Sequence, residues 1–150
     1  MNKYVFDYLR IIGFTDNEIN YIEDNNEYIF YVNLVHIKKI ITILQDLGLD
    51  NINIRKTLIK NVYIITEKIE KINLLNNVYF EVLNLNKEEL KELIINNPNI
   101  YMISVSELSN NINYLKEHNY GVDAIKKFLL TYPQVTSMSP EEFRNLVKFD

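Results

Sequence analysis

The fold is decided by residues 104–142, SVSELSNNINYLKEHNYGVDAIKKFLLTYPQVTSMSPEE, which contain one complete helical repeat and the start of the next. Ser104 with a glutamate three residues later forms a capping-box start, and apolar residues then recur at the three- and four-residue spacings of an amphipathic helix. Gly121 separates this helix from a second apolar stripe, which Pro133 ends. The stretch predicts a helix, a second helix and a short turn, with a new helix starting at Ser139.

The same pattern recurs along the chain with a period of about 35 residues. Its clearest marker, the anchor, is the residue that ends the first helix of each repeat and belongs to a type that tolerates a left-handed backbone. The anchors are Gly13, Gly48, Asn84 and Asn119, at spacings of 35, 36 and 35. An aliphatic residue follows each anchor after six and after sixteen positions. These aliphatic residues are Ile19, Ile54, Leu90 and Ile125, and Ile29, Ile64, Ile100 and Val135. One extra residue in the third repeat accounts for its longer spacing.

Repeated helix pairs of this length predict an α-solenoid, because a single pair cannot bury its apolar face without a neighbour. We predict a single all-α repeat domain over residues 1–150, built from about four three-helix repeats (helix, helix, short 3-10 turn) and a terminal helix. The repeats are expected at residues 1–32, 33–66, 67–103 and 104–138, with a partial terminal repeat at 139–150.

The composition is that of a globular protein that folds without disulfide bonds. Of the 150 residues, 47% are hydrophobic and 24% are charged, and there is no cysteine. The N-terminal residues lack the pattern of a signal or transit peptide, and no stretch approaches the apolar length of a membrane span. We therefore expect a cytoplasmic protein with no membrane partner. Heavy use of Asn, Ile and Lys indicates an AT-rich genome and most simply a bacterial source.

The charge is uneven along the chain. The net charge of -4 argues against a protein that coats nucleic acid indiscriminately, since phosphate binding draws on clustered Lys and Arg. Residues 1–32 hold two basic and six acidic residues, whereas residues 33–66 hold five basic and two acidic residues. Only the second repeat is clearly basic.

Several segments resemble the repeat of the mTERF family, the mitochondrial transcription termination factors. The resemblance is strongest over residues 84–146, where NNPNI (96–100) and TYPQV (131–135) look like the family's proline segment after the second helix. LGL (47–49) and IGF (12–14) are similar to its Leu-Gly-Leu/Phe break.

The resemblance implies a fold and a function. It implies a curved, right-handed array of three-helix repeats, a role in transcription regulation, and binding of double-stranded DNA or RNA along a basic concave path without catalysis. The chain is short and acidic for that family, and Glu27 and Val62 occupy the proline position in the first two repeats.

Aligning the repeats gives one candidate site. Seven residues after the anchors stand Asn20, Arg55, Lys91 and Lys126, so stacked second helices would present three cations in a column that could follow phosphates. Further cations on the same helices would widen that column. The candidate nucleic-acid-binding residues are Arg55, Lys56, Lys60, Lys91, Lys126 and Lys127. The competing interpretation is a solvated helix face, in which Lys91 pairs with Glu88 across one helical turn.

A protein-binding solenoid is the alternative function. Curved repeat surfaces commonly grip a partner helix or peptide, and the acidic first repeat favours a basic partner. The aromatic residues could stack on single-stranded bases, but Phe80, Tyr114 and Phe128 fall in or beside apolar stripes, which favours packing.

The sequence offers no constellation for catalysis. His36 and His118 lie at different repeat positions without recurring acidic neighbours, and three glycines are too few for a phosphate-binding loop. We therefore expect no enzyme activity, catalytic residue, metal, cofactor or small-molecule substrate.

Overall fold

The computed structural model describes residues 1–149, and within them the chain is helical and contains no strand. Each predicted repeat contains two α-helices followed by a short 3-10 helix, so the predicted all-α fold of three-helix repeats is confirmed. Repeats one and two comprise α1 (Lys3–Ile12), α2 (Asp16–Asn25), η1 (Glu27–Phe30), α3 (Leu34–Asp46), α4 (Asn51–Lys60) and η2 (Val62–Thr66). Repeats three and four comprise α5 (Ile69–Asn77), η3 (Val78–Val82), α6 (Lys87–Asn96), η4 (Pro98–Tyr101), α7 (Val105–Glu117), α8 (Val122–Thr131) and η5 (Pro133–Ser137), and α9 (Pro140–Leu146) follows.

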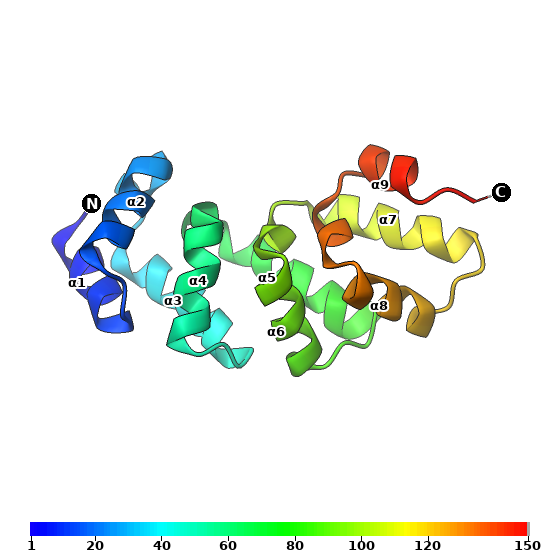
Figure 1. Cartoon of the computed structure of the whole chain (residues 1–150), viewed down its shortest axis with the longest axis horizontal. Coiled ribbons are helices and arrows are strands. Elements are labelled where there is room, and N and C mark those ends of the chain that lie inside the picture. Colours follow the sequence, from blue (N-terminus) through cyan, green and yellow to red (C-terminus); the bar gives the residue numbers. More distant parts are fainter. Residues whose placement is uncertain (150) are drawn as a thin grey trace. The chain divides into compact units, whose positions relative to one another are not determined.

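The chain divides into two compact units. Unit 1, Met1–Ile69, contains repeats one and two, and α1 packs on α3 there while α2 packs on α4 (Figure 1). Unit 2, Glu70–Asp150, contains repeats three and four with α9, which packs on α7. The extent of the single domain expected over residues 1–150 stays a prediction.

The anchors adopt the backbone that their residue types allow. Gly13, Gly48, Asn84 and Asn119 have φ angles of 115°, 95°, 56° and 69°, all in or near the left-handed region. In this conformation the chain reverses after the first helix, and non-glycine residues other than Asn and Asp adopt it rarely. The predicted capping boxes also form, with Thr15, Ser104 and Ser139 accepting from the backbone N–H three residues later.

The extra residue of the third repeat lies in a π turn. The first helix of that repeat is regular over α5 and then widens to π geometry over Val78–Val82. A π turn contains one more residue than an α turn, and here it is the last turn of the first helix, just before the anchor Asn84, so the extra residue leaves α5 unshifted. This explains the 36-residue spacing.

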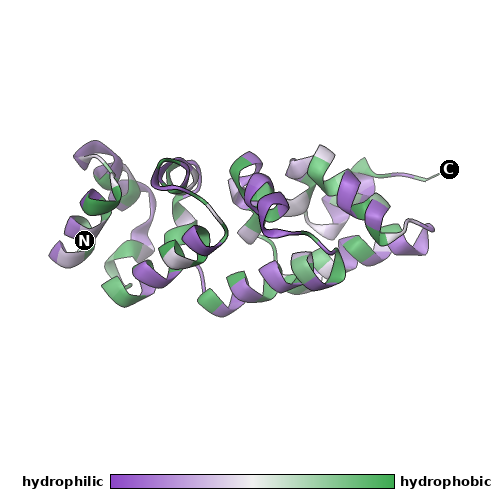
Figure 2. Cartoon of the chain, turned by 90° about the horizontal axis from the view of Figure 1, so that it is seen from below, coloured by the Kyte–Doolittle hydropathy of each residue, from purple (hydrophilic) through white to green (hydrophobic). Residues whose placement is uncertain are grey.

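The core follows the predicted register. Hydrophilic and hydrophobic residues are interspersed along the same helices, as expected when one side of each helix is buried (Figure 2). All eight aliphatic residues at six and sixteen positions after the anchors are buried. Phe80, Tyr114 and Phe128 are half-buried, and the last two contact the ring of Phe143 edge-on.

Candidate nucleic-acid interface

Arg55 on α4 contacts the preceding repeat at two points. Its Nη1 donates to the carbonyl oxygen of the anchor Gly13 at 2.9 Å, and its Nε lies 3.4 Å from Oε1 of Glu18. Glu18 Oε1 also accepts from the backbone N–H of Thr15 at 2.9 Å within the capping box of α2. One glutamate thus caps its own helix and holds a cation from the next repeat.

Lys126 on α8 makes the same contacts in unit 2. Its Nζ donates to the carbonyl oxygen of the anchor Asn84 at 3.3 Å and lies 2.9 Å from Oε1 of Glu89. Glu89 is the capping-box glutamate of α6, with Asn86 as the helix cap. We call this arrangement of a cation, an anchor carbonyl and a capping glutamate the clasp. Within residues 1–149 it occurs once in each unit, between its two repeats.

Local electrostatics favour the clasp. Carbonyl groups at a helix C-terminus have no partner within the helix and carry partial negative charge, so they attract a cation. The backbone N–H of Asn86 and then Lys126 lower the pKa of the Glu89 carboxyl, because both bond its charged form. Side-chain exposure is 33% for Arg55 and 25% for Lys126, so these two candidate cations are half-buried.

The third cation at the same repeat position has a local partner. Lys91 Nζ lies 2.9 Å from Oε2 of Glu88, which is the pair that the solvated-face interpretation predicts. Pairs of this kind contribute a few tenths of a kcal/mol.

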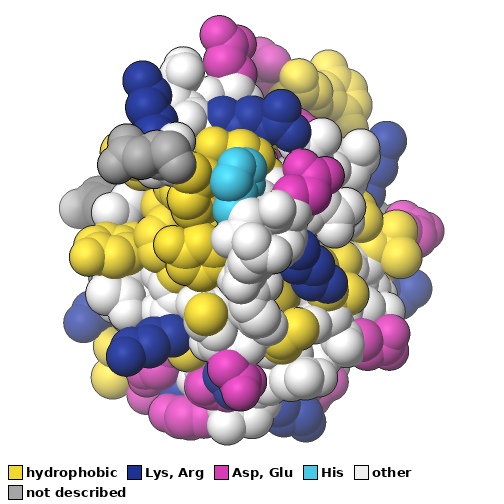
Figure 3. All heavy atoms as spheres, turned by 90° about the vertical axis from the view of Figure 1, so that its right-hand side faces the viewer, with side chains coloured by type: hydrophobic (Ala, Val, Ile, Leu, Met, Phe, Trp, Pro, Cys, Tyr) yellow, Lys and Arg dark blue, Asp and Glu magenta, His cyan; other side chains and the backbone are white. Residues whose placement is uncertain are grey.

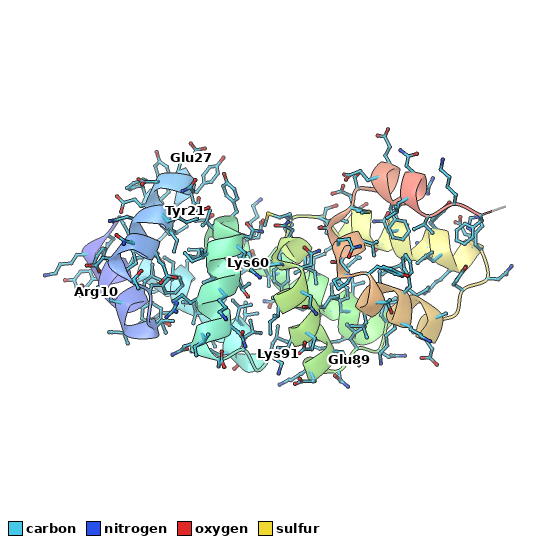
Figure 4. The ribbon with its side chains drawn as sticks, in the orientation of Figure 1. Arg10, Tyr21, Glu27, Lys60, Glu89 and Lys91 are labelled. Carbon is cyan, nitrogen blue, oxygen red and sulfur yellow. The ribbon has the colours of Figure 1, made fainter. Side chains whose placement is uncertain are left out.

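The remaining three candidates are exposed to solvent. Within residues 1–149, Lys56, Lys60 and Lys127 have no ion-pair partner. Figure 4 labels Lys60 on α4 in unit 1 and Lys91 on α6 in unit 2. Lys127 lines a groove of about 450 Å³. The other lining residues are Glu89, Asp123, Lys126, Leu130 and Thr131.

Each unit therefore carries three of the six predicted cations. Arg55, Lys56 and Lys60 share α4 in unit 1, while Lys91 lies on α6 and Lys126 and Lys127 lie on α8 in unit 2. In both units, one cation forms the clasp and its neighbour in sequence is exposed.

A buried asparagine position was missed by the sequence reasoning. Asn26 Nδ2 donates to the carbonyl of Val62 at 2.9 Å and to Oγ1 of Thr66 at 3.0 Å, in the next repeat. In unit 2, Asn97 Nδ2 donates to the carbonyl of Pro133 at 3.0 Å and to Oγ1 of Thr136 at 2.9 Å. Asparagine recurs thirteen residues after the first three anchors, and this recurrence is the signal that could have identified the position.

No group of three His, Cys, Asp or Glu residues within residues 1–149 could hold a metal ion. Every helix in the same range is too short or too polar to cross a lipid bilayer.

Comparison with known proteins gives one family. The mTERF family model matches residues 1–149, which is nearly the whole chain. None of the curated proteins matches it.

Proposed function

Because this chain belongs to the mTERF family, we propose that it is a non-enzymatic helical-repeat protein that binds double-stranded DNA or RNA. The observation that carries the proposal is the set of exposed lysines on the second helices, Lys56 and Lys60 in unit 1 and Lys127 in unit 2. These side chains can neutralise phosphates without first breaking an ion pair inside the protein.

Arg55 and Lys126 act differently in this proposal. Each already contacts a carbonyl oxygen and a carboxylate, so it adds positive potential next to an exposed lysine and keeps the second helices in place. Lys91 contributes in the same indirect way, since Glu88 neutralises much of its charge.

Contacts to phosphates carry no sequence information, so binding should be weak and tolerant of sequence. Since the whole chain carries a charge of -4, its net charge repels a polyanion at long range, and the local lysines must supply the affinity.

Fluorescence anisotropy with labelled duplex DNA, duplex RNA and single-stranded DNA tests the proposal. The triple variant Lys56→Gln/Lys60→Gln/Lys127→Gln should lose most of the duplex affinity of the wild type. Its matched control is Lys39→Gln/Lys68→Gln/Lys116→Gln, which removes three exposed lysines outside the second helices. Equal losses in both variants would contradict the assigned surface. No duplex binding by the wild type would contradict the function and favour the protein-binding alternative.

A further inference from the structure

Three positions of the repeat lie between one repeat and the next. They stand one, nine and thirteen residues after the anchor. In repeats one and three, whose successors lie in the same unit, these residues are at most 7% exposed. They are Phe14, Ile22 and Asn26 in repeat one, and Leu85, Leu93 and Asn97 in repeat three. Of these residues, Asn26 and Asn97 donate hydrogen bonds directly to the following repeat.

In repeat four the same positions form an open aromatic groove. They are occupied by Tyr120, Phe128 and Tyr132, and the two tyrosines are 42% and 50% exposed. The groove has a volume of about 520 Å³ and is also lined by Leu146 and Phe149. Figure 3 views the molecule from the right-hand side of Figure 1, where α7 to α9 lie, and shows hydrophobic side chains gathered on this face. The ring of Phe149 lies against that of Tyr120, with their centroids 5.5 Å apart, and forms part of the lining.

Repeat four lacks the polar groups that hold the following repeat in repeats one and three. Tyr132 stands where Asn26 and Asn97 donate to the next repeat. Ala124 stands where Glu18 and Glu89 hold the cation of the clasp. A further repeat stacked in the same way would find neither the amide donor nor the carboxylate acceptor, so the groove is suited to a different occupant.

The opposite end of the repeat series is polar. Residues four, seven and eleven positions after an anchor face the preceding repeat, as Asp123, Lys126 and Leu130 do in the groove beside Glu89. In repeat one these positions carry Asn17, Asn20 and Asp24, all exposed. A head-to-tail contact between copies would place the aromatic groove against these polar residues, which is unfavourable.

The charges around α9 suit a contact of the groove face with itself. α9 begins with exposed Glu141 in its first turn, and exposed Lys148 follows its end. Neither has an ion-pair partner in the described part of the chain. If two copies met through this face with their α9 helices antiparallel, Glu141 of each would approach Lys148 of the other, while exposed Leu146 would meet apolar surface.

We propose that the aromatic groove of repeat four is a self-association surface, at which a second copy of this chain docks through the same face about a two-fold axis. An isologous contact places the same patch on both sides, so an apolar centre meets an apolar centre. This proposal does not depend on nucleic-acid binding. It assigns the chain a second interaction surface, separate from the exposed lysines of the second helices.

Light scattering after size exclusion and sedimentation velocity, over a concentration series without nucleic acid, test this proposal. The wild type should approach twice the 17.9 kDa mass of one chain as concentration rises through the micromolar range. Tyr132→Glu/Leu146→Glu should remain a monomer, because two charges would be buried in the contact. The control Tyr4→Glu/Ile11→Glu alters two exposed apolar residues of unit 1 and should dimerise like the wild type. Circular dichroism should show that the wild type and both double variants are folded.

A monomeric wild type at hundreds of micromolar would overturn the proposal, as would a dimer that the control weakens and the groove variant does not. A charge exchange tests the arrangement of the helices. Glu141→Lys and Lys148→Glu should each weaken the dimer at least several-fold, and the double exchange should restore it. Failure of the double exchange to restore the dimer would overturn the antiparallel arrangement of α9.

Discussion

Lys126 and Lys127 are neighbours in sequence, and the fold gives them different roles. Lys126 reaches back to the carbonyl of Asn84 and to Glu89, whereas Lys127 is exposed and has no ion-pair partner within residues 1–149. The residue that stands out most in the repeat alignment is therefore the one that holds two repeats together, and its neighbour is the better candidate for a phosphate contact.

Replacing each of these lysines by methionine separates the two roles. Lys126→Met should lower the free energy of unfolding by about 0.5–1 kcal/mol, because a half-exposed ion pair and one hydrogen bond to a carbonyl are lost. Lys127→Met should change it by less than about 0.5 kcal/mol, as expected for an exposed side chain. Urea denaturation followed by circular dichroism measures both. An equal cost for the two substitutions would refute the clasp.

The clasp should also depend on pH. Asn86 and Lys126 hold the pKa of Glu89 below its ordinary value, so the folded state favours the charged carboxylate. This contribution to stability is complete above the unfolded pKa of about 4.3 and is lost as pH falls through the lower folded value. The stability difference between wild type and Glu89→Gln should therefore be present at neutral pH and shrink below about pH 4. A difference that stays constant down to acidic pH would show that Glu89 acts without its charge.

The buried asparagine contributes more than the clasp. Asn97→Ala removes two amide donors to the next repeat and the side-chain cap of η4, and the carbonyl of Pro133 keeps only the hydroxyl of Thr136 as a partner. The expected cost is about 2–4 kcal/mol, which combines the lost buried hydrogen bonds with the lost cap. Asn99→Ala, at an exposed position two residues later, is the control and should be close to neutral. Thermal unfolding compares them, and similar melting temperatures would contradict the role of Asn97.

At the level of the element, local chemistry made most of the fold predictable. Capping boxes at Thr15, Ser104 and Ser139 gave the helix starts, and the anchors gave the ends of the first helices. These signals lie within a few residues of the structure they specify. The contacts of Asn26 and Arg55 were not predictable in this way, since their partners lie 36 to 42 residues distant and become neighbours only when the repeats stack.

The sequence predicts that the third repeat has an extra residue, but it does not predict where that residue lies. The 36-residue spacing reveals an extra residue, but several segments of the third repeat could have contained it as a loop insertion. The structure places it at Val78–Val82. Buried Tyr79 and Leu83 flank the exposed Glu81, so the helix widens where solvent lies on one side.

Deleting Glu81 should convert the π turn to an α turn. The helical content should be retained, with a cost of no more than about 1–2 kcal/mol, because the π turn is the end of its helix and α5 before it keeps its register. Deleting the exposed Asn113 from the regular helix α7 is the control. It rotates every later residue of that helix by about 100° and should unfold unit 2 or cost several kcal/mol. Circular dichroism at 222 nm and a thermal melt distinguish them, and equal damage from both deletions would refute the insertion role.

For the whole molecule, the repeat explains how an acidic chain can carry local basic surface. The net charge is -4, yet acidic residues such as Glu18 and Glu89 are occupied by capping and by the clasp. The second helices keep Lys56, Lys60 and Lys127 exposed. Membership of the mTERF family and this placement of charge lead to the same proposal.

The candidate site was predictable only in part. The alignment placed the candidate cations on the second helices, because a period of about 35 residues places equivalent residues on equivalent surfaces. It could not separate Arg55 and Lys126 from Lys56 and Lys127, because that distinction depends on which side chain reaches the preceding repeat.

The salt dependence of duplex binding tests the central claim most directly. Three phosphate contacts predict a slope of roughly -3 in log affinity against log salt, or a loss of roughly 60-fold between about 50 and 200 mM salt. The variant Lys56→Gln/Lys60→Gln/Lys127→Gln should reduce that slope nearly to zero, while Lys39→Gln/Lys68→Gln/Lys116→Gln should keep it. A wild-type affinity that does not change with salt, or a slope that the second-helix variant retains, would contradict the account.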